Sequence, residues 1–94
     1  MTVLEDLTRD YRAAFLRYVA QRSEAALTLG YQLGRESVVR GAGLLELVQV
    51  HHLVLAEVLN DAPPEDSADL ASAASEFLLE VVSTFDMAHR RLQE

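Results

Sequence analysis

The sequence predicts an all-α domain in which four helices form a bundle. No segment alternates apolar and polar residues with period two, so nothing in the chain is typical of a strand. Apolar residues instead recur at three- and four-residue spacing along most of the chain. Strong helix breakers gather at only two places, 41–43 and 60–64. Short connections of this kind favour a bundle, and 94 residues are enough for one small domain.

The stretch before the first breaker is too long for one typical globular helix. We therefore predict two helices, over 3–20 and 22–40. Ser23 can cap the second one, and Gly30 and Gly34 either weaken it or allow a neighbour to pack closely. The apolar stripe through both helices consists of Leu4, Leu7, Tyr11, Ala14, Phe15, Tyr18, Ala25, Ala26, Leu29 and Leu33.

The third predicted helix, 44–60, is apolar nearly all round. Its main stripe consists of Leu44, Leu47, Val48, His51, Leu55, Val58 and Leu59. Further apolar residues lie outside that stripe, namely Leu45, Val50, Leu53 and Ala56. A helix of this kind is buried on most sides, and one small monomer can hardly cover it. Together with the first helix, it predicts a homodimer with a shared core.

The fourth predicted helix starts near Ser67 or Asp69 and remains regular to the end of the chain. Its core stripe consists of Leu70, Ala74, Phe77, Leu78, Val81, Val82, Phe85, Ala88 and Leu92. Leu79 and Ser83 point to the opposite side. A single exposed leucine is normal on a protein surface, but one among small and polar residues also suits a partner-binding face.

Composition excludes several function classes. The net charge is −7, with eight arginines, no lysine and fifteen acids, so nucleic acid and anionic membranes are not expected partners. The acidity serves solubility or steers a basic partner. The chain has no run of 18 apolar residues, no signal-peptide pattern at its start and no cysteine. We expect a cytoplasmic protein.

No catalytic or metal-binding pattern is present in the sequence. His51 and His52 are adjacent and diverge by about 100° on a helix, so they cannot face one metal ion. Glu76 and Glu80 share a helix face, but no Glu-x-x-His motif accompanies them, and we expect them to be solvated or paired with arginine. No serine lies in a nucleophile elbow. We predict a non-enzymatic module without metal or cofactor.

A family resemblance extends this interpretation. The positions that carry it are Tyr11, Arg17-Tyr18, Ala20, Glu24, Leu27 and Arg35, then Val50-His51, Leu55 and Glu57, then Phe77-Leu78-Leu79-Glu80-Val81, Phe85 and Met87-Ala88. In this ordered set, which covers nearly the whole chain, the sequence resembles the N-terminal domain of RsbU-type phosphatases. These are the environmental phosphatases of bacterial partner-switching pathways.

The resemblance implies a dimeric four-helix module, here 1–94, at the head of a PP2C-like serine phosphatase in a longer protein. Such a module binds an RsbT-like switch kinase, which activates the phosphatase. The phosphatase then dephosphorylates an anti-anti-sigma factor, and a stress sigma factor is released. The positions that match the kinase-binding surface of the family are Glu24, Thr28, Leu79 and Ser83.

Three features depart from the family pattern, and two other functions stay open. The family often has an aromatic residue at the position of Thr28, Pro residues where Ala42-Gly43 open the third helix, and a larger apolar residue at the position of Ser83. The surface that faces the kinase would therefore be smaller and more polar here. One alternative is a purely structural dimerisation domain. The other is a bundle that senses a small apolar ligand in a cavity beside the Ala and Gly residues of the second helix.

Overall fold

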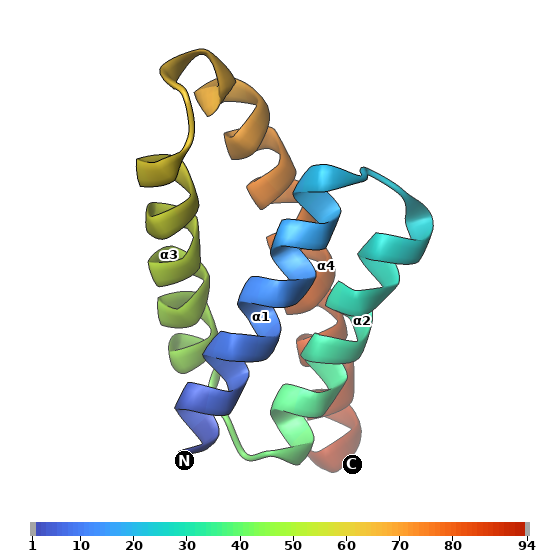
Figure 1. Cartoon of the computed structure of the whole chain (residues 1–94). Helices are drawn as coiled ribbons and strands as arrows, with labels where there is room; N and C mark the ends of the chain where they lie inside the picture. The colour runs from blue at the N-terminus through green and yellow to red at the C-terminus, as the bar shows by residue number, and fades with distance from the viewer. Residues whose placement is uncertain (1, 94) are drawn as a thin grey trace.

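The computed structural model describes residues 2–93, which form four α-helices and one short 3₁₀ helix (Figure 1). Their bounds are α1 Val3–Ala20, α2 Glu24–Val39, α3 Leu44–Asp61, η1 Pro64–Asp66 and α4 Ser67–Gln93. No strand occurs between residues 2 and 93. The predicted all-α class and the four helices are confirmed, with boundaries that agree to within two residues in the first three helices.

Local hydrogen bonds place the helix ends. The Thr2 hydroxyl accepts from the Glu5 N–H, and the Ser23 hydroxyl accepts from the Ala26 N–H, each at 3.1 Å. Gly43 precedes α3, and its own N–H donates to the Glu46 carboxylate at 3.0 Å. Gly41 has φ +82°, a conformation that glycine adopts readily just after a helix end. The Ser23 bond lies in the connection before α2, and Gly41 and the Gly43 bond lie in the connection after it.

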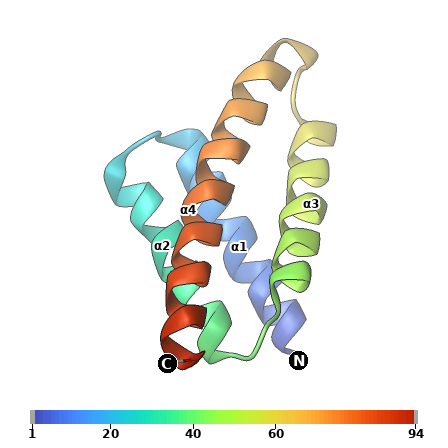
Figure 2. The ribbon, with the colours of Figure 1, turned by 180° about the vertical axis from the view of Figure 1, so that it is seen from behind.

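The four helices are arranged around an aromatic cluster. In Figure 1, α1 runs through the middle, with α3 on one side, α2 on the other and α4 behind. Seen from behind, α4 lies between α2 and α3 (Figure 2). The buried ring of Phe77 on α4 contacts three rings of α1, with centroid distances of 5.3, 5.7 and 5.8 Å to Tyr11, Phe15 and Tyr18. The core therefore forms where α1 crosses α4.

The backbones of α2 and α4 approach each other because of two glycines. A Cβ atom on Gly34 would lie 1.8 Å from the Thr84 hydroxyl oxygen and 2.4 Å from the Val81 carbonyl oxygen. A Cβ atom on Gly30 would lie 3.1 Å from the Phe77 ring. The glycines thus serve close packing. The space beside these two glycines is filled by α4, so the glycines themselves leave no cavity for a ligand.

Polar side chains join α1 to its neighbours. Arg12 donates two hydrogen bonds to the Glu57 carboxylate on α3, at 2.8 and 3.0 Å. The hydrogen bonds from Arg12 hold the pKa of Glu57 below its usual value. Arg40, which caps the C-terminus of α2, bonds to Asp10 at 2.9 Å. These contacts lie at the periphery of the core and fix the orientation of α1 relative to α2 and α3.

The predicted stripe of α3 is wrong in part. Its buried residues are Leu47, Val50 and Val54, and Val50 is one that we placed outside the stripe. Three predicted stripe members are exposed instead, namely Leu44, Val48 and Leu59. The reason is that α3 contacts the rest of the bundle along one narrow line with i, i+3, i+7 spacing. The side chains on either side of this line are largely exposed to solvent. The spacing of apolar residues alone could not show which side of the helix faces the bundle.

The predicted stripe of α4 is confirmed except at its C-terminal end. Leu92 is exposed although it continues the pattern, and it borders hollows between α4 and the end of α2. Thr84 is buried although it is polar, since it lies against Gly34. Its hydroxyl is satisfied by donating to the carbonyl oxygens of Glu80 and Val81, each at 3.1 Å.

Candidate functional site

The outer face of α4 carries a strip of exposed side chains. Leu79 is 68% exposed and Ser83 is also exposed, as we predicted from helical geometry. Met87 is the next residue at four-residue spacing and is 53% exposed. A leucine and a methionine two turns apart, with a small serine on the turn between them, form an accessible apolar strip.

Two further predicted site residues lie on the exposed surface of α2. Glu24 is in the first turn, and Thr28 follows one turn later. The Thr28 hydroxyl donates to the Glu24 carbonyl oxygen at 2.9 Å, so its polar atom is occupied by its own helix. Thr28 borders a shallow groove whose other lining residues include Tyr31, Arg35 and Val39.

The four predicted residues form two pairs, one on each helix. Thr28 lines the groove along α2, whereas Ser83 lines a different hollow beside the start of α3. A third hollow connects the two helices and is lined by Tyr31, Val38, Val39, Thr84, Met87, Ala88 and Leu92, together with Arg35 and Arg91. We call it the α2–α4 groove. None of the four predicted residues lines this groove.

The α2–α4 groove combines apolar walls with positive charge. Val39 is 85% exposed, and Tyr31 is also accessible. The Arg35 guanidinium lies over the Tyr31 ring, 5.9 Å from its centroid. Neither Arg35 nor Arg91 forms an ion pair with any residue between 2 and 93. Among residues 2–93, no carboxylate lines the groove.

Sequence reasoning missed the α2–α4 groove. One sequence pattern could have indicated its α2 side. Tyr31, Arg35 and Val39 recur every four residues and so share one face of α2. That face is distinct from the buried one, which contains Leu33 and Ser37. The matching signal on α4 is Met87 followed four residues later by Arg91. The spacing alone does not reveal that the two faces border one groove.

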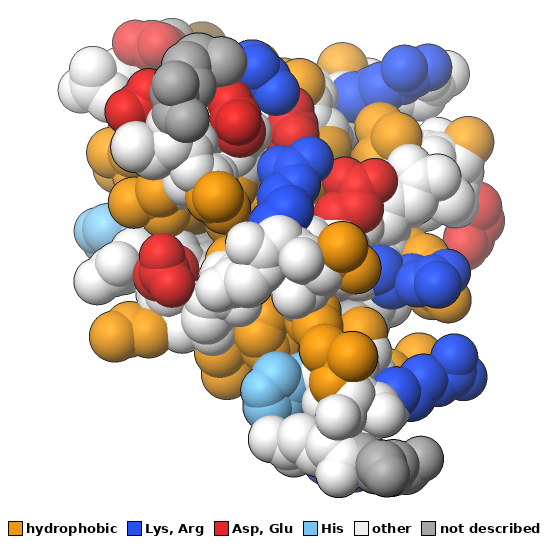
Figure 3. Space-filling view, turned by 90° about the horizontal axis from the view of Figure 1, so that it is seen from below, with side chains coloured by type: hydrophobic (Ala, Val, Ile, Leu, Met, Phe, Trp, Pro, Cys, Tyr) orange, Lys and Arg blue, Asp and Glu red, His pale blue; other side chains and the backbone are white. Residues whose placement is uncertain are grey.

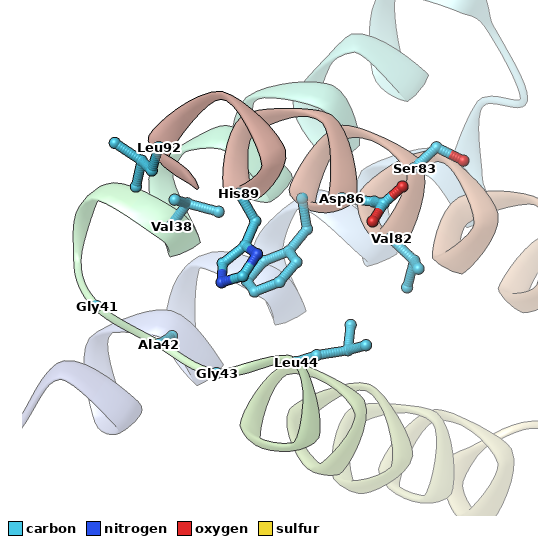
Figure 4. A pocket seen from close by; sticks show the side chains of 11 residues that line it. Val38, Gly41, Ala42, Gly43, Leu44, Val82, Ser83, Asp86, His89 and Leu92 are labelled. Carbon is cyan, nitrogen blue, oxygen red and sulfur yellow. The ribbon is translucent and has the colours of Figure 1, made fainter. Parts of the chain in front are cut away.

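A separate pocket of about 630 Å³ lies at the C-terminal end of α4 (Figure 4). Its walls are Val38, residues 41–43 and Leu44 on one side, and residues of α4 on the other. The imidazole of His89 stacks on the ring of Phe85, with centroids 5.8 Å apart and planes at 9°. Figure 4 places Asp86 and Ser83 on the α4 side, away from His89. The pocket is mostly apolar with a few polar groups.

Elsewhere the polar residues have structural partners. His51 is half-buried, and its Nδ1 lies 2.6 Å from the Tyr11 hydroxyl, whereas His52 is exposed. Burial lowers the pKa of His51. Glu76 pairs with Arg22, as we expected for this acid. Among residues 2–93, no three His, Cys, Asp or Glu side chains are grouped so that they could hold a metal ion.

Comparison with known proteins identifies one family. A family model described as the N-terminal domain of the phosphoserine phosphatase RsbU matches residues 9–88. The search of curated proteins and the search of solved structures returned no match. In the part of the chain that the structure describes, no helix has the length and apolar character needed to cross a membrane.

Proposed function

The chain belongs to the family of N-terminal domains of the phosphoserine phosphatase RsbU, and on this premise we propose that it binds an RsbT-like switch kinase and forms a homodimer. The domain is thus a regulatory and non-catalytic module. In our proposal, docking of the kinase activates a serine phosphatase joined to α4. The phosphatase acts in a partner-switching pathway that controls a stress sigma factor.

One observation carries the proposed docking face. The resemblance assigns Glu24, Thr28, Leu79 and Ser83 to the proposed kinase-binding face, and all four are exposed on α2 and α4. Leu79 supports the proposal most strongly, because a largely exposed leucine is the kind of apolar anchor that a partner can bury. Thr28 and Ser83 are small, so the kinase surface opposite them must be correspondingly fuller.

The proposed dimer interface is the outer face of α3. Leu45 and Leu53 are 71% and 49% exposed, and the ten residues 47–56 contain no acid and no arginine. On the side of the molecule where α3 lies, Figure 3 shows mainly hydrophobic and histidine side chains, with acidic ones beside them. In a chain with net charge −7, such a face minimises repulsion between two copies. A second copy offers the same apolar surface in return.

The proposed mechanism couples docking to the exit of α4. This helix has 27 residues and so extends about 40 Å along the bundle. Leu79 lies at the middle of the helix, and Ser83 lies one turn further toward the C-terminus. A kinase bound there contacts the same helix that would continue into the phosphatase. Binding would favour one orientation of the two paired α4 helices and so bring the catalytic domains into an active arrangement.

A specific observation favours one alternative function. The pocket of about 630 Å³ at the C-terminal end of α4 falls within the range typical of small-ligand sites. A ligand there would touch both the α2–α3 connection and α4, so it could also influence the exit of α4. If the domain serves only for dimerisation, substitutions in the docking face or in this pocket should not change its function.

The proposal is tested by light-scattering mass of this domain, alone and with RsbT-like kinases from the same organism. We expect a dimer that binds kinase. The variant Leu79→Asp should remain a dimer and lose the kinase, because a buried unpaired carboxylate is unfavourable at an interface. Ala13→Asp adds the same charge at an exposed site on α1 and should change neither. A domain that ignores every kinase, or a Leu79→Asp variant that binds normally, would overturn the docking face.

A further inference from the structure

We propose that the α2–α4 groove binds an acidic segment of a partner protein. One apolar side chain of that segment would enter the groove, and its carboxylates would pair with Arg35 and Arg91. The inference rests on the proposed function in one respect, since it names the chemistry of a partner docked on the same two helices. It concerns residues nearer the C-terminal ends of α2 and α4 than the four family positions.

The size and the walls of the groove suit a protein side chain. Its volume is about 230 Å³, below the range typical of pockets that enclose a whole small ligand. Tyr31 and Val39 on α2 face Met87 and Leu92 on α4 across it. Tyrosine, methionine and arginine are the residue types enriched at protein interfaces, and methionine adapts to the shape of what it covers.

The charges of the groove specify the partner. Five of the eight arginines form ion pairs within residues 2–93, whereas Arg17, Arg35 and Arg91 do not. Two of those three line this one groove, and no carboxylate of the described part of the chain lines it with them. A guanidinium presents donors that match a carboxylate in a two-pronged geometry, and Arg35 is already held over the Tyr31 ring. The groove therefore complements an acidic segment with an apolar anchor.

The net charge of the domain opposes non-specific binding of an acidic segment. At −7 the domain as a whole attracts basic molecules and repels acidic ones. Non-specific attraction therefore cannot deliver an acidic peptide to the groove. Binding of such a peptide would have to come from the local arrangement of Arg35, Arg91 and the apolar walls.

The test uses two synthetic peptides and amide chemical shifts of the isotope-labelled domain. Acetyl-EELFEE-amide is the acidic probe, and acetyl-KKLFKK-amide has the same apolar centre with opposite charge. We expect the acidic peptide to shift the amides of Tyr31, Val39 and Met87, and the basic peptide to leave them in place. Equal shifts with both peptides, or shifts confined to other surfaces, would overturn the inference. So would equal shifts with sodium phenylacetate, which would indicate a site for small anions.

Charge reversal supplies a matched control. Arg35→Glu should weaken binding of the acidic peptide at least tenfold, since it replaces a partner of the carboxylates by a repelling charge. Arg17→Glu changes the net charge equally, at an exposed arginine of α1 that also lacks an ion pair within residues 2–93, and should leave the affinity within twofold. Equal weakening by both variants would mean that only net charge matters, and the inference would fall.

The same variants separate this inference from the proposed function. If Leu79→Asp abolishes kinase binding while Arg35→Glu affects neither kinase nor peptide, the docking face stands and the acidic-segment inference is wrong. If no kinase binds but the acidic peptide still requires Arg35, the groove stands and its partner is another protein. If both variants weaken the kinase, one partner covers both parts of the surface.

Discussion

At the residue scale, the contact between Tyr11 and His51 places a polar pair at the edge of the core. Tyr11 is fully buried, and its hydroxyl lies 2.6 Å from Nδ1 of the half-buried imidazole. In neutral histidine one ring nitrogen accepts while the other donates. The Tyr11 hydroxyl can therefore donate to Nδ1, and the other ring nitrogen carries the proton.

Removal of the Tyr11 hydroxyl should destabilise the fold. We expect Tyr11→Phe to lower the free energy of unfolding by about 1 kcal/mol, because Nδ1 of His51 loses its partner at a partly desolvated position. Urea denaturation followed by circular dichroism measures the change. Tyr31→Phe is the matched control, since Tyr31 is exposed, and it should have almost no effect. Equal effects of the two variants would contradict this account.

The depressed pKa of His51 also predicts a pH dependence of stability. Burial disfavours the imidazolium, and the neighbouring His52 adds a smaller effect in the same direction. The unfolded chain, with an ordinary histidine pKa of about 6.5, then binds more protons than the folded one just below that pH. Stability should therefore fall as the pH drops from about 6.5. His51→Gln should flatten this slope and His52→Gln should not, as unfolding at several pH values would reveal.

At the element scale, α2 depends on glycine where it meets α4. Gly34→Ala should lower the free energy of unfolding by about 2 kcal/mol, because the new methyl group would overlap the Val81 carbonyl and Thr84. That cost exceeds the gain in helix propensity, which is about 1 kcal/mol. Gly30→Ala meets only the rings and methyl groups of side chains, at 3.1 Å or more, and should be close to neutral. Thermal and urea unfolding of both variants provide the measurement.

Sequence patterns predicted the helices better than the faces that these helices bury. The breakers at 41–43 and 60–64 mark two of the three connections between the α-helices because Gly and Pro act locally. The buried side of α3 depends instead on where its neighbours lie, and an apolar residue stands in nearly every sector of that helix. Val50 was therefore placed on the wrong side. The exposure of Leu79 followed from spacing on α4, where one face is clearly dominant.

Sequence patterns also failed to predict which residues line the α2–α4 groove. Arg35 and Met87 are far apart in the chain, and nothing in their local patterns indicates that they line a common hollow. Their proximity follows from the contact between Gly34 and Thr84, which is a property of the pair of helices. Residues of a site on one helix can be anticipated from periodicity, whereas residues joined across two helices require the packing.

At the scale of the whole molecule, we expect the exposed face of α3 to determine the oligomeric state. Leu45→Glu combined with Leu53→Glu should convert the dimer to a monomer, because two copies would then oppose four carboxylates at an apolar interface. Sedimentation velocity measures the mass. Leu79→Glu is the control on an equally exposed leucine and should remain dimeric. Dimerisation of the double variant would show that another face mediates the contact.

The contact at Gly34 has a mechanical consequence. Where two helices meet through long side chains, rotamer changes absorb small displacements of one relative to the other. Here the backbone of α2 lies directly against the backbone of α4, and no side chain of residue 34 intervenes. Closely packed atoms of this kind have little compliance. At this level the two helices therefore move as one rigid unit. A displacement of α2 is transmitted to α4 almost completely.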